Sequence, residues 1–223
     1  MSLIKLNNIC VEYGRKNKQR ALNDVSMEIE DKEFVAVMGK SGCGKTTLLN
    51  VLGTLLKPQS GEYIFDGKPV LAKSSNELAE FRNENMGFVV QHFALVPDMS
   101  IYDNVALPLT YRKMSKSDVK NRVMAVLEEL EIYDQKNKYP GELSGGQCQR
   151  AAIARAIVTE PRLILADEPT GALDGENGNM VMDILQKLNA KGITIIMVTH
   201  DKELAQCASR IIRMQDGCIY RNC

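Results

Sequence analysis

One nine-residue stretch, Gly39 to Thr47, constrains the fold of this chain more than any other. Its sequence, GKSGCGKTT, matches the pattern G-x-x-x-x-G-K-[ST] of a phosphate-binding loop. The residues before it, 34–38, form a short apolar run that is typical of a strand buried on both faces. The residues after it place leucines at helical spacing until Pro58. Strand, glycine-rich loop and helix therefore follow one another in the order that phosphate binding requires.

Each residue type in this loop has a chemical task. Glycines let the backbone approach phosphate oxygens, successive N–H groups point inward, and the helix N-terminus adds positive potential. Lys45 can reach the terminal phosphates, and the Thr46 hydroxyl can ligate Mg²⁺. A glycine-rich turn could match the pattern by chance, but here both flanks have the correct character. We therefore predict that the chain binds a nucleotide through Gly39, Ser41, Gly42, Cys43, Gly44, Lys45, Thr46 and Thr47.

Two adjacent acids, Asp167 and Glu168, follow a second short apolar run at 163–166. The ligand crevice of an open α/β sheet lies at the carboxyl ends of its strands, and burying two carboxylates there is costly without a purpose. One acid can hold Mg²⁺ while the other orients or deprotonates a water molecule. His200 also follows a buried-strand pattern, at 193–199. A lone histidine is usually structural, but we expect this one at the same sheet edge.

A third unusual stretch, 143–147, has two adjacent glycines at the start of an expected helix. Ser144 and Gln147 stand in the register of a capping box, so on the simplest interpretation they only cap that helix. Glycines are costly there, however, and permit close backbone approach to another group. Because a helix N-terminus favours anions, Gly146 and its neighbours could instead approach a ligand.

The remaining pattern predicts both strands and helices. Partly alternating segments at 3–13 and 25–29, and a turn at Asp66 and Gly67, predict a small antiparallel sheet beside the nucleotide core. Residues 86–90 read as a buried strand, and the segment after Ser115 reads as a capped amphipathic helix.

Composition excludes several classes of protein. Lys+Arg and Asp+Glu both count 28, so no basic surplus indicates binding to nucleic acid. No apolar run approaches the roughly 18 residues of a membrane span, and the N-terminus lacks the layout of a signal peptide. We expect a cytoplasmic protein that reaches a membrane only through a partner. The six cysteines show no C-x-x-C spacing, which argues against both zinc and a disulfide framework.

Taken in order, these motifs resemble the ATP-binding cassette of ABC proteins over essentially the whole chain. The resemblance implies an α/β fold: a P-loop NTPase core with a RecA-like, mostly parallel sheet, an N-terminal antiparallel β-subdomain and an inserted α-helical subdomain. Residues 1–223 would form one ATPase domain, with the core and β-subdomain at 1–90 and 160–223 and the helical subdomain at about 91–159. Seven elements carry the resemblance: Tyr13 as the aromatic residue that stacks on adenine, the phosphate-binding loop, Gln91, the signature at 143–147, Asp167 with Glu168, the loop at 172–174, and His200.

The resemblance also implies a mechanism. Two copies would pair head to tail and trap ATP between the phosphate-binding loop of one chain and the signature of the other. Lys45 would neutralise phosphate charge, and Glu168 would act as general base on the attacking water. The other implied roles are Mg²⁺ binding by Thr46, Gln91 and Asp167, contact with the γ-phosphate by His200, and closure of the site in trans by the signature residues Ser144, Gly146 and Gln147.

Four further segments, 81–83, 87–89, 91–97 and 103–109, resemble the bacterial subgroup that serves lipoprotein release, macrolide efflux and antimicrobial-peptide export or resistance. Cys148 is a departure, because the subgroup usually carries a longer polar residue or Met there.

We therefore expect an ATPase subunit that powers export of a peptide, lipoprotein or drug through a separate permease, on the inner face of the cell membrane. The permease would dock near Gln91–Tyr102, an apolar and aromatic segment broken by proline, although these side chains could simply pack the helical lobe. Two alternatives stay open. The cassette could drive a force-transmitting membrane complex of the cell-division type, or it could be a soluble ABC ATPase, which the size and charge of the chain disfavour.

Overall fold

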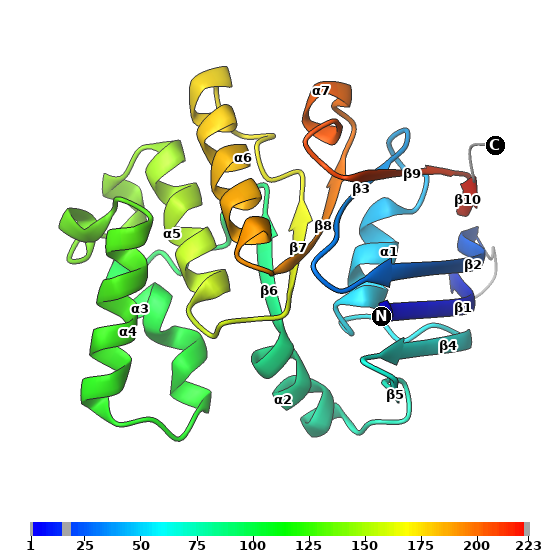
Figure 1. The fold of residues 1–223 in the computed structure, drawn as a ribbon, viewed down its shortest axis with the longest axis horizontal. Helices are drawn as coiled ribbons and strands as arrows, with labels where there is room; N and C mark the ends of the chain where they lie inside the picture. Colours follow the sequence, from blue (N-terminus) through cyan, green and yellow to red (C-terminus); the bar gives the residue numbers. More distant parts are fainter. Residues whose placement is uncertain (1, 15–18, 221–223) are drawn as a thin grey trace.

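A computed structural model describes residues 2–14 and 19–220, which form two β-sheets with helices packed around them (Figure 1). The strands of these residues are β1 Ser2–Tyr13, β2 Gln19–Glu30, β3 Phe34–Met38, β4 Ser60–Phe65, β5 Lys68–Pro69, β6 Met86–Val90, β7 Leu163–Asp167, β8 Thr194–Thr199, β9 Arg210–Gln215 and β10 Cys218–Tyr220. The α-helices are α1 Lys45–Leu52, α2 Ser75–Asn85, α3 Ile101–Ala106, α4 Lys116–Glu129, α5 Gly145–Ile157, α6 Gly175–Ala190 and α7 Lys202–Ala205. Short 3₁₀ helices are η1 Leu107–Tyr111, η2 Tyr133–Gln135 and η3 Pro140–Glu142.

The smaller sheet is antiparallel, with strand order β2-β1-β4-β5. Asp66 and Gly67 form the turn between β4 and β5, and both have positive φ, at 50° and 72°. A tight turn of this kind matches the twist of two paired strands, which is why Asp-Gly is a strong hairpin signal. The antiparallel sheet expected near the N-terminus is confirmed.

The larger sheet has the order β10-β9-β3-β8-β7-β6 and is parallel from β9 to β6. In its register Met38 pairs with Thr199, and Asp167 pairs with both Val198 and Val90. The carboxyl ends of β3, β6, β7 and β8 therefore meet at one edge. The phosphate-binding loop and the other motifs that follow these strands are brought together there, as the sequence predicted.

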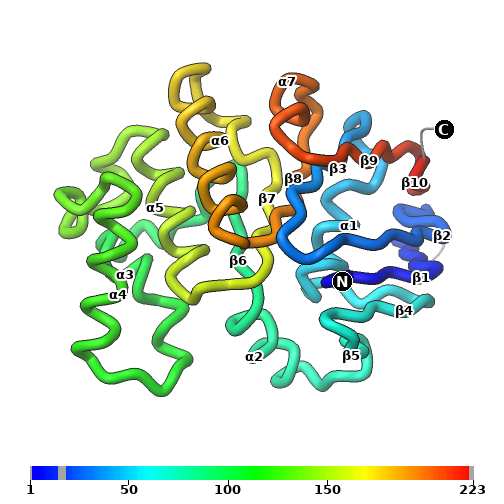
Figure 2. The backbone as a smooth tube through the Cα atoms, viewed as in Figure 1, coloured from blue at the N-terminus to red at the C-terminus, as the bar shows by residue number. Residues whose placement is uncertain are grey.

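Both faces of the larger sheet are covered, which explains the uninterrupted apolar strands. Along β3, Val35 and Val37 pack into a core with the smaller sheet and α1, while Phe34 and Ala36 face a second core formed with α3 to α6. Strands buried on both sides lose the alternation of polar and apolar residues. Figures 1 and 2 show the smaller sheet and helices α3 to α5 on opposite sides of the larger sheet.

Helix α1 is shorter than the leucine pattern predicts. It ends at Leu52 and is capped by Gly53, well before Pro58. A Cβ at Gly53 would lie 2.6 Å from the ring of Phe88, so the chain needs a glycine to pass this ring. Leu55, which continues the helical spacing, lies outside the helix and is 59% exposed. Directly after Gly53, Thr54 takes a left-handed φ of 54°, and the helical hydrogen bonding stops there although the leucine spacing continues.

Candidate nucleotide site

A pocket of about 590 Å³ opens at the carboxyl edge of the larger sheet. It brings together many of the residues that the sequence singles out: Tyr13, Ser41, Gly42, Gly44, Lys45, Thr46, Thr47, Gln91, Asp167 and Glu168. The start of β2 also contributes to its lining, as do three residues at strand ends, and these were not predicted: Gln19, Arg20, Ala21, Val90, His92 and Val198.

The glycines of the phosphate-binding loop allow close approaches that no side chain could accommodate. Gly44 has a φ of 105°, and a Cβ there would lie 2.3 Å from the carbonyl oxygen of Ala21. A Cβ at Gly39 would lie 2.2 Å from the carbonyl oxygen of Met214. Cys43 is buried beside Gly39. Gly39 and Cys43 therefore shape the loop from behind, while Ser41, Gly42 and residues 44–47 line the pocket.

Lys45 is held inside this loop. Only 8% of the residue is exposed, and its Nζ donates hydrogen bonds to the carbonyl oxygens of Gly39 at 2.8 Å and Lys40 at 3.0 Å. A largely buried ammonium needs such partners. Charged phosphate oxygens are stronger acceptors than carbonyls, so the ammonium is poised to bind a phosphate.

Thr46 and Asp167 form the oxygen pair expected of a magnesium site. The hydroxyl of Thr46 donates to Oδ2 of Asp167 at 3.4 Å. Burial raises the pKa of the Asp167 carboxyl, and the charge of Glu168 acts in the same direction, against Thr46 and Lys45. A partly desolvated carboxylate gains from a cation, and Mg²⁺ is commonly held by one or two protein oxygens together with phosphates and water. The residues present fit this ion.

The carboxylate of Glu168 is fixed by two side chains from the end of β8. Its Oε1 lies 2.7 Å from Nδ1 of His200, and its Oε2 accepts a hydrogen bond from the Thr199 hydroxyl at 3.4 Å. The Glu168 side chain is 19% exposed, whereas the His200 side chain is 74% exposed. His200 does not line the pocket and reaches it through Glu168. Thr199 was not predicted, although its place directly before His200 at the end of a buried strand was a usable signal.

Gln91 and Tyr13 lie at the border of the pocket. Gln91 follows β6, and its amide rests against Gly171, where a Cβ would lie 2.8 Å from Nε2. The Tyr13 hydroxyl lies 3.5 Å from Oγ1 of Thr47, and 46% of the tyrosine is exposed. An aromatic ring with this exposure can still stack on a planar ligand.

The signature lies outside the pocket of its own chain. Ser144 and Gln147 form the full capping box at the start of α5: each backbone N–H donates to the other side chain, at 3.0 and 3.3 Å. Ser144 is exposed, but Gly146 is buried. A Cβ at Gly146 would lie 2.2 Å from Oδ1 of Asn177 in α6. The close backbone approach predicted for these glycines is therefore made in part to Asn177 of the same chain.

A phosphate-binding loop, a threonine–aspartate pair and a partly buried glutamate at one edge of a parallel sheet define a P-loop nucleoside triphosphatase. The family model described as ABC transporter matches residues 22–171. The chain is 46% identical over 216 residues to the ABC transporter ATP-binding protein MJ1508 of Methanocaldococcus jannaschii, covering 96% of each. The chain belongs to the ABC transporter family and is an ATP-binding cassette ATPase.

Other relatives have export in their names. The bacitracin export ATP-binding protein BceA of Halalkalibacterium halodurans is 43% identical, with 99% of this chain and 88% of that protein covered. The macrolide export ATP-binding/permease protein MacB of Campylobacter jejuni is 46% identical, but only 33% of its length is covered. The dimeric post-hydrolysis structure of the cassette MJ0796 bound to ADP and Pi superposes with a TM-score of 0.90 at 41% identity, covering 98% of this chain and 97% of that one.

Proposed function

We propose that this chain is the ATP-hydrolysing subunit of an ABC export complex, with Glu168 as the general base. The position of the Glu168 carboxylate carries the proposal, because it lines the pocket and is held by His200 and Thr199. A carboxylate fixed in this way can accept a proton from an attacking water. The export names of BceA and MacB support the export role.

The other side chains position and neutralise the phosphates. Lys45 would offset phosphate charge, Thr46 and Asp167 would hold Mg²⁺, and Gln91 would complete the shell of metal and water. Bound Mg²⁺ would supply further charge stabilisation at the phosphate oxygens. His200 holds Glu168 from outside the pocket, and it would contact the γ-phosphate once the second copy closes the site. Phosphoryl transfer depends chiefly on such positioning and charge stabilisation.

The functional unit is a head-to-tail homodimer in which the signature of one copy closes the pocket of the other. The exposure of Ser144 outside its own pocket supports this arrangement, because a free helix N-terminus favours an anion. The dimeric structures of MJ0796, one of them bound to ADP and Pi, support it further.

Replacing Glu168 by Gln tests the assignment of the base. Turnover of the purified protein should fall at least about 100-fold, the range that general bases contribute, while ATP stays bound. Lys45→Ala should instead weaken ATP binding. Glu203→Gln is the matched control, because Glu203 is an exposed glutamate on α7 away from the pocket. Unchanged turnover in Glu168→Gln would refute the assignment.

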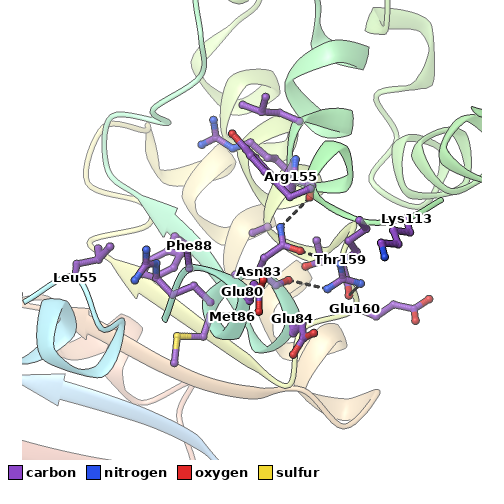
Figure 3. A pocket seen from close by; sticks show the side chains of 18 residues that line it. Leu55, Glu80, Asn83, Glu84, Met86, Phe88, Lys113, Arg155, Thr159 and Glu160 are labelled. Carbon is purple, nitrogen blue, oxygen red and sulfur yellow. Dashed lines mark hydrogen bonds between the residues drawn. The ribbon is translucent and has the colours of Figure 1, made fainter. Parts of the chain in front are cut away.

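The permease partner places the cassette at the cytoplasmic face of the membrane. No helix in residues 2–14 and 19–220 is long and apolar enough to cross a bilayer. A second hollow, of about 1180 Å³, provides a docking surface (Figure 3). Tyr111 and Leu55, which are 80% and 59% exposed, lie on its lining together with Phe88. Such exposed apolar side chains beside a hollow suit a short helix of a partner.

The expected docking segment, Gln91–Tyr102, borders this hollow without lining it. Arg155 lines the hollow and donates hydrogen bonds to the carbonyls of Phe93 and Ala94, so the two surfaces are joined by one side chain. Leu95 and Tyr102 pack against the helical core, which leaves less of the segment free than the sequence suggests. The proposed docking surface therefore comprises the hollow together with the adjoining segment Gln91–Tyr102.

Charge placed in the hollow tests this docking proposal. Tyr111→Asp should abolish co-purification with the permease encoded beside this chain and stimulation of turnover by it, while ATP binding is unchanged. Tyr139→Asp is the control, because Tyr139 is also an exposed tyrosine, at 50%, but does not line the hollow. Retention of the permease by Tyr111→Asp, together with its loss in variants of another surface, would place the contact elsewhere.

A further inference from the structure

Gln149 is fully buried in α5, and its side chain reaches the backbone directly after the proposed base. Its Nε2 donates a hydrogen bond to the carbonyl oxygen of Pro169. Its Oε1 is buried and has no hydrogen-bond partner among the residues that the structure describes. An unpaired buried carbonyl is costly, whereas a leucine or methionine of similar volume would fill the same space without that cost. Packing alone therefore gives no reason for an amide at this position.

The residue directly before the Pro169 that Gln149 contacts has a strained backbone. Glu168 has a φ of 45°, in the left-handed region that residues other than glycine rarely adopt. Such a conformation persists only where the surroundings over-determine it. The Glu168 N–H donates to Val198 at 3.0 Å, and the Glu168 carbonyl accepts from Gly171 at 3.0 Å. Because proline has no N–H, the carbonyl of Pro169 is its only backbone hydrogen-bonding group, and Gln149 binds it.

The same part of α5 contacts the segment after Glu168 at two more places. A Cβ at Gly145 would lie 3.3 Å from the Leu173 side chain, and one at Gly146 would lie against Asn177. Gln149 lies one turn further along this helix. The start of α5 and the segment 169–177 are thus joined by adjacent close contacts. A movement of the start of α5 would therefore displace the backbone of Pro169 and hence that of Glu168.

We propose that Gln149 is a positioning residue that holds the Glu168 carboxylate in its working place and links it to the signature helix of the same chain. This inference rests on the proposed function, in which Ser144 of that helix binds ATP held by the second copy. The two ATP sites would then be connected through each chain, since engagement of the signature at one site sets the base at the other.

Gln149→Met tests the positioning role, because methionine has a similar length and no amide. We expect kcat for ATP to fall about tenfold or more, since small misplacements of reacting groups are costly, while KM changes less than about twofold. Ile153→Val is the matched control: Ile153 is fully buried on the same helix in the apolar core. It should lower the melting temperature without lowering kcat. A wild-type kcat in Gln149→Met, or an equal loss in both variants, would overturn the proposal.

Mixed dimers separate an effect on the base from an effect on the signature. A copy with Glu168→Gln, paired through a second affinity tag with a copy that keeps Glu168, leaves one hydrolysing site. Gln149→Met should slow that site about tenfold when it lies in the copy with the intact base, and much less when it lies in the other copy. The reverse order, or equal slowing, would show that Gln149 serves the signature and would overturn the proposal. Failure of the proposed function would appear separately, as the absence of an ATP-dependent dimer before any rate is measured.

Discussion

Replacing Gly146 by alanine separates the two roles that this signature glycine could have. Within the chain, the new Cβ would lie 2.2 Å from Oδ1 of Asn177 and would displace that side chain. Nδ2 of Asn177 would then lose its contacts with the Asp174 carboxylate, at 2.9 and 3.0 Å. This loss costs about 0.5–1.5 kcal/mol. Alanine in a helix is favoured over glycine by about 0.8–1.0 kcal/mol, which offsets it.

The free energy of unfolding should therefore change by less than about 1 kcal/mol, which corresponds to less than about 4 °C in melting temperature for a chain of this size. In the dimer, however, the same methyl group would obstruct the approach of the α5 backbone to the ATP of the second copy. We expect ATP hydrolysis to fall at least tenfold, with ATP binding to the isolated chain unchanged. Calorimetry and a phosphate-release assay measure the two effects independently.

Shortening Asn177, the side chain that the new methyl group would meet, gives the decisive control. Asn177→Ala removes the amide that the new methyl group would meet, so adding Gly146→Ala to Asn177→Ala should cost no further stability. Hydrolysis should stay low, because the obstruction in trans remains. If Asn177→Ala restores hydrolysis in the double variant, the glycine is needed only for packing within the chain, and the reasoning about trans contact is wrong.

Two further variants have outcomes that follow from contacts in the structure. Burial raises the pKa of the Asp167 carboxyl, so the nucleotide-free fold loses stability as pH rises through the raised pKa. The melting temperature of Asp167→Asn should therefore lie above that of the wild type at pH 8 and converge with it near pH 3, and ATP binding to this variant should no longer depend on Mg²⁺. A lower melting temperature of the variant at pH 8 would contradict this. Arg155 donates hydrogen bonds to the carbonyls of Phe93 and Ala94, whose φ values are 60° and 49°. Arg155→Met should lower the free energy of unfolding by about 2–3 kcal/mol and the melting temperature by about 4–12 °C, and it should speed hydrogen exchange at 91–94. Unchanged exchange there would show that the guanidinium does not hold this segment.

Much of the site could be predicted because its residues follow buried strands. The register of a parallel sheet places all carboxyl ends at one edge, so residues as distant in sequence as Lys45, Asp167 and His200 converge without any further information. The glycine-rich loop was equally clear, since its backbone geometry demands glycine at Gly44.

Features that depend on packing between distant segments could not be predicted. Gly53, at the end of α1, lies against the ring of Phe88 in β6, which the leucine spacing does not reveal. Gln149 was not singled out from the sequence, and only the structure shows it buried against Pro169. For the signature glycines, the sequence predicted a close backbone approach but did not reveal that Asn177 is one of the groups approached.

The central claim is that ATP is hydrolysed in a composite site that needs two copies of the chain. Light scattering of purified Glu168→Gln, with and without saturating Mg-ATP, tests it most directly, since blocking cleavage should trap the closed state. The account predicts a doubling of mass with ATP and none with ADP, and loss of the dimer when Ser144→Arg is added. A Glu168→Gln protein that binds ATP yet stays monomeric, both alone and with its permease, would contradict it.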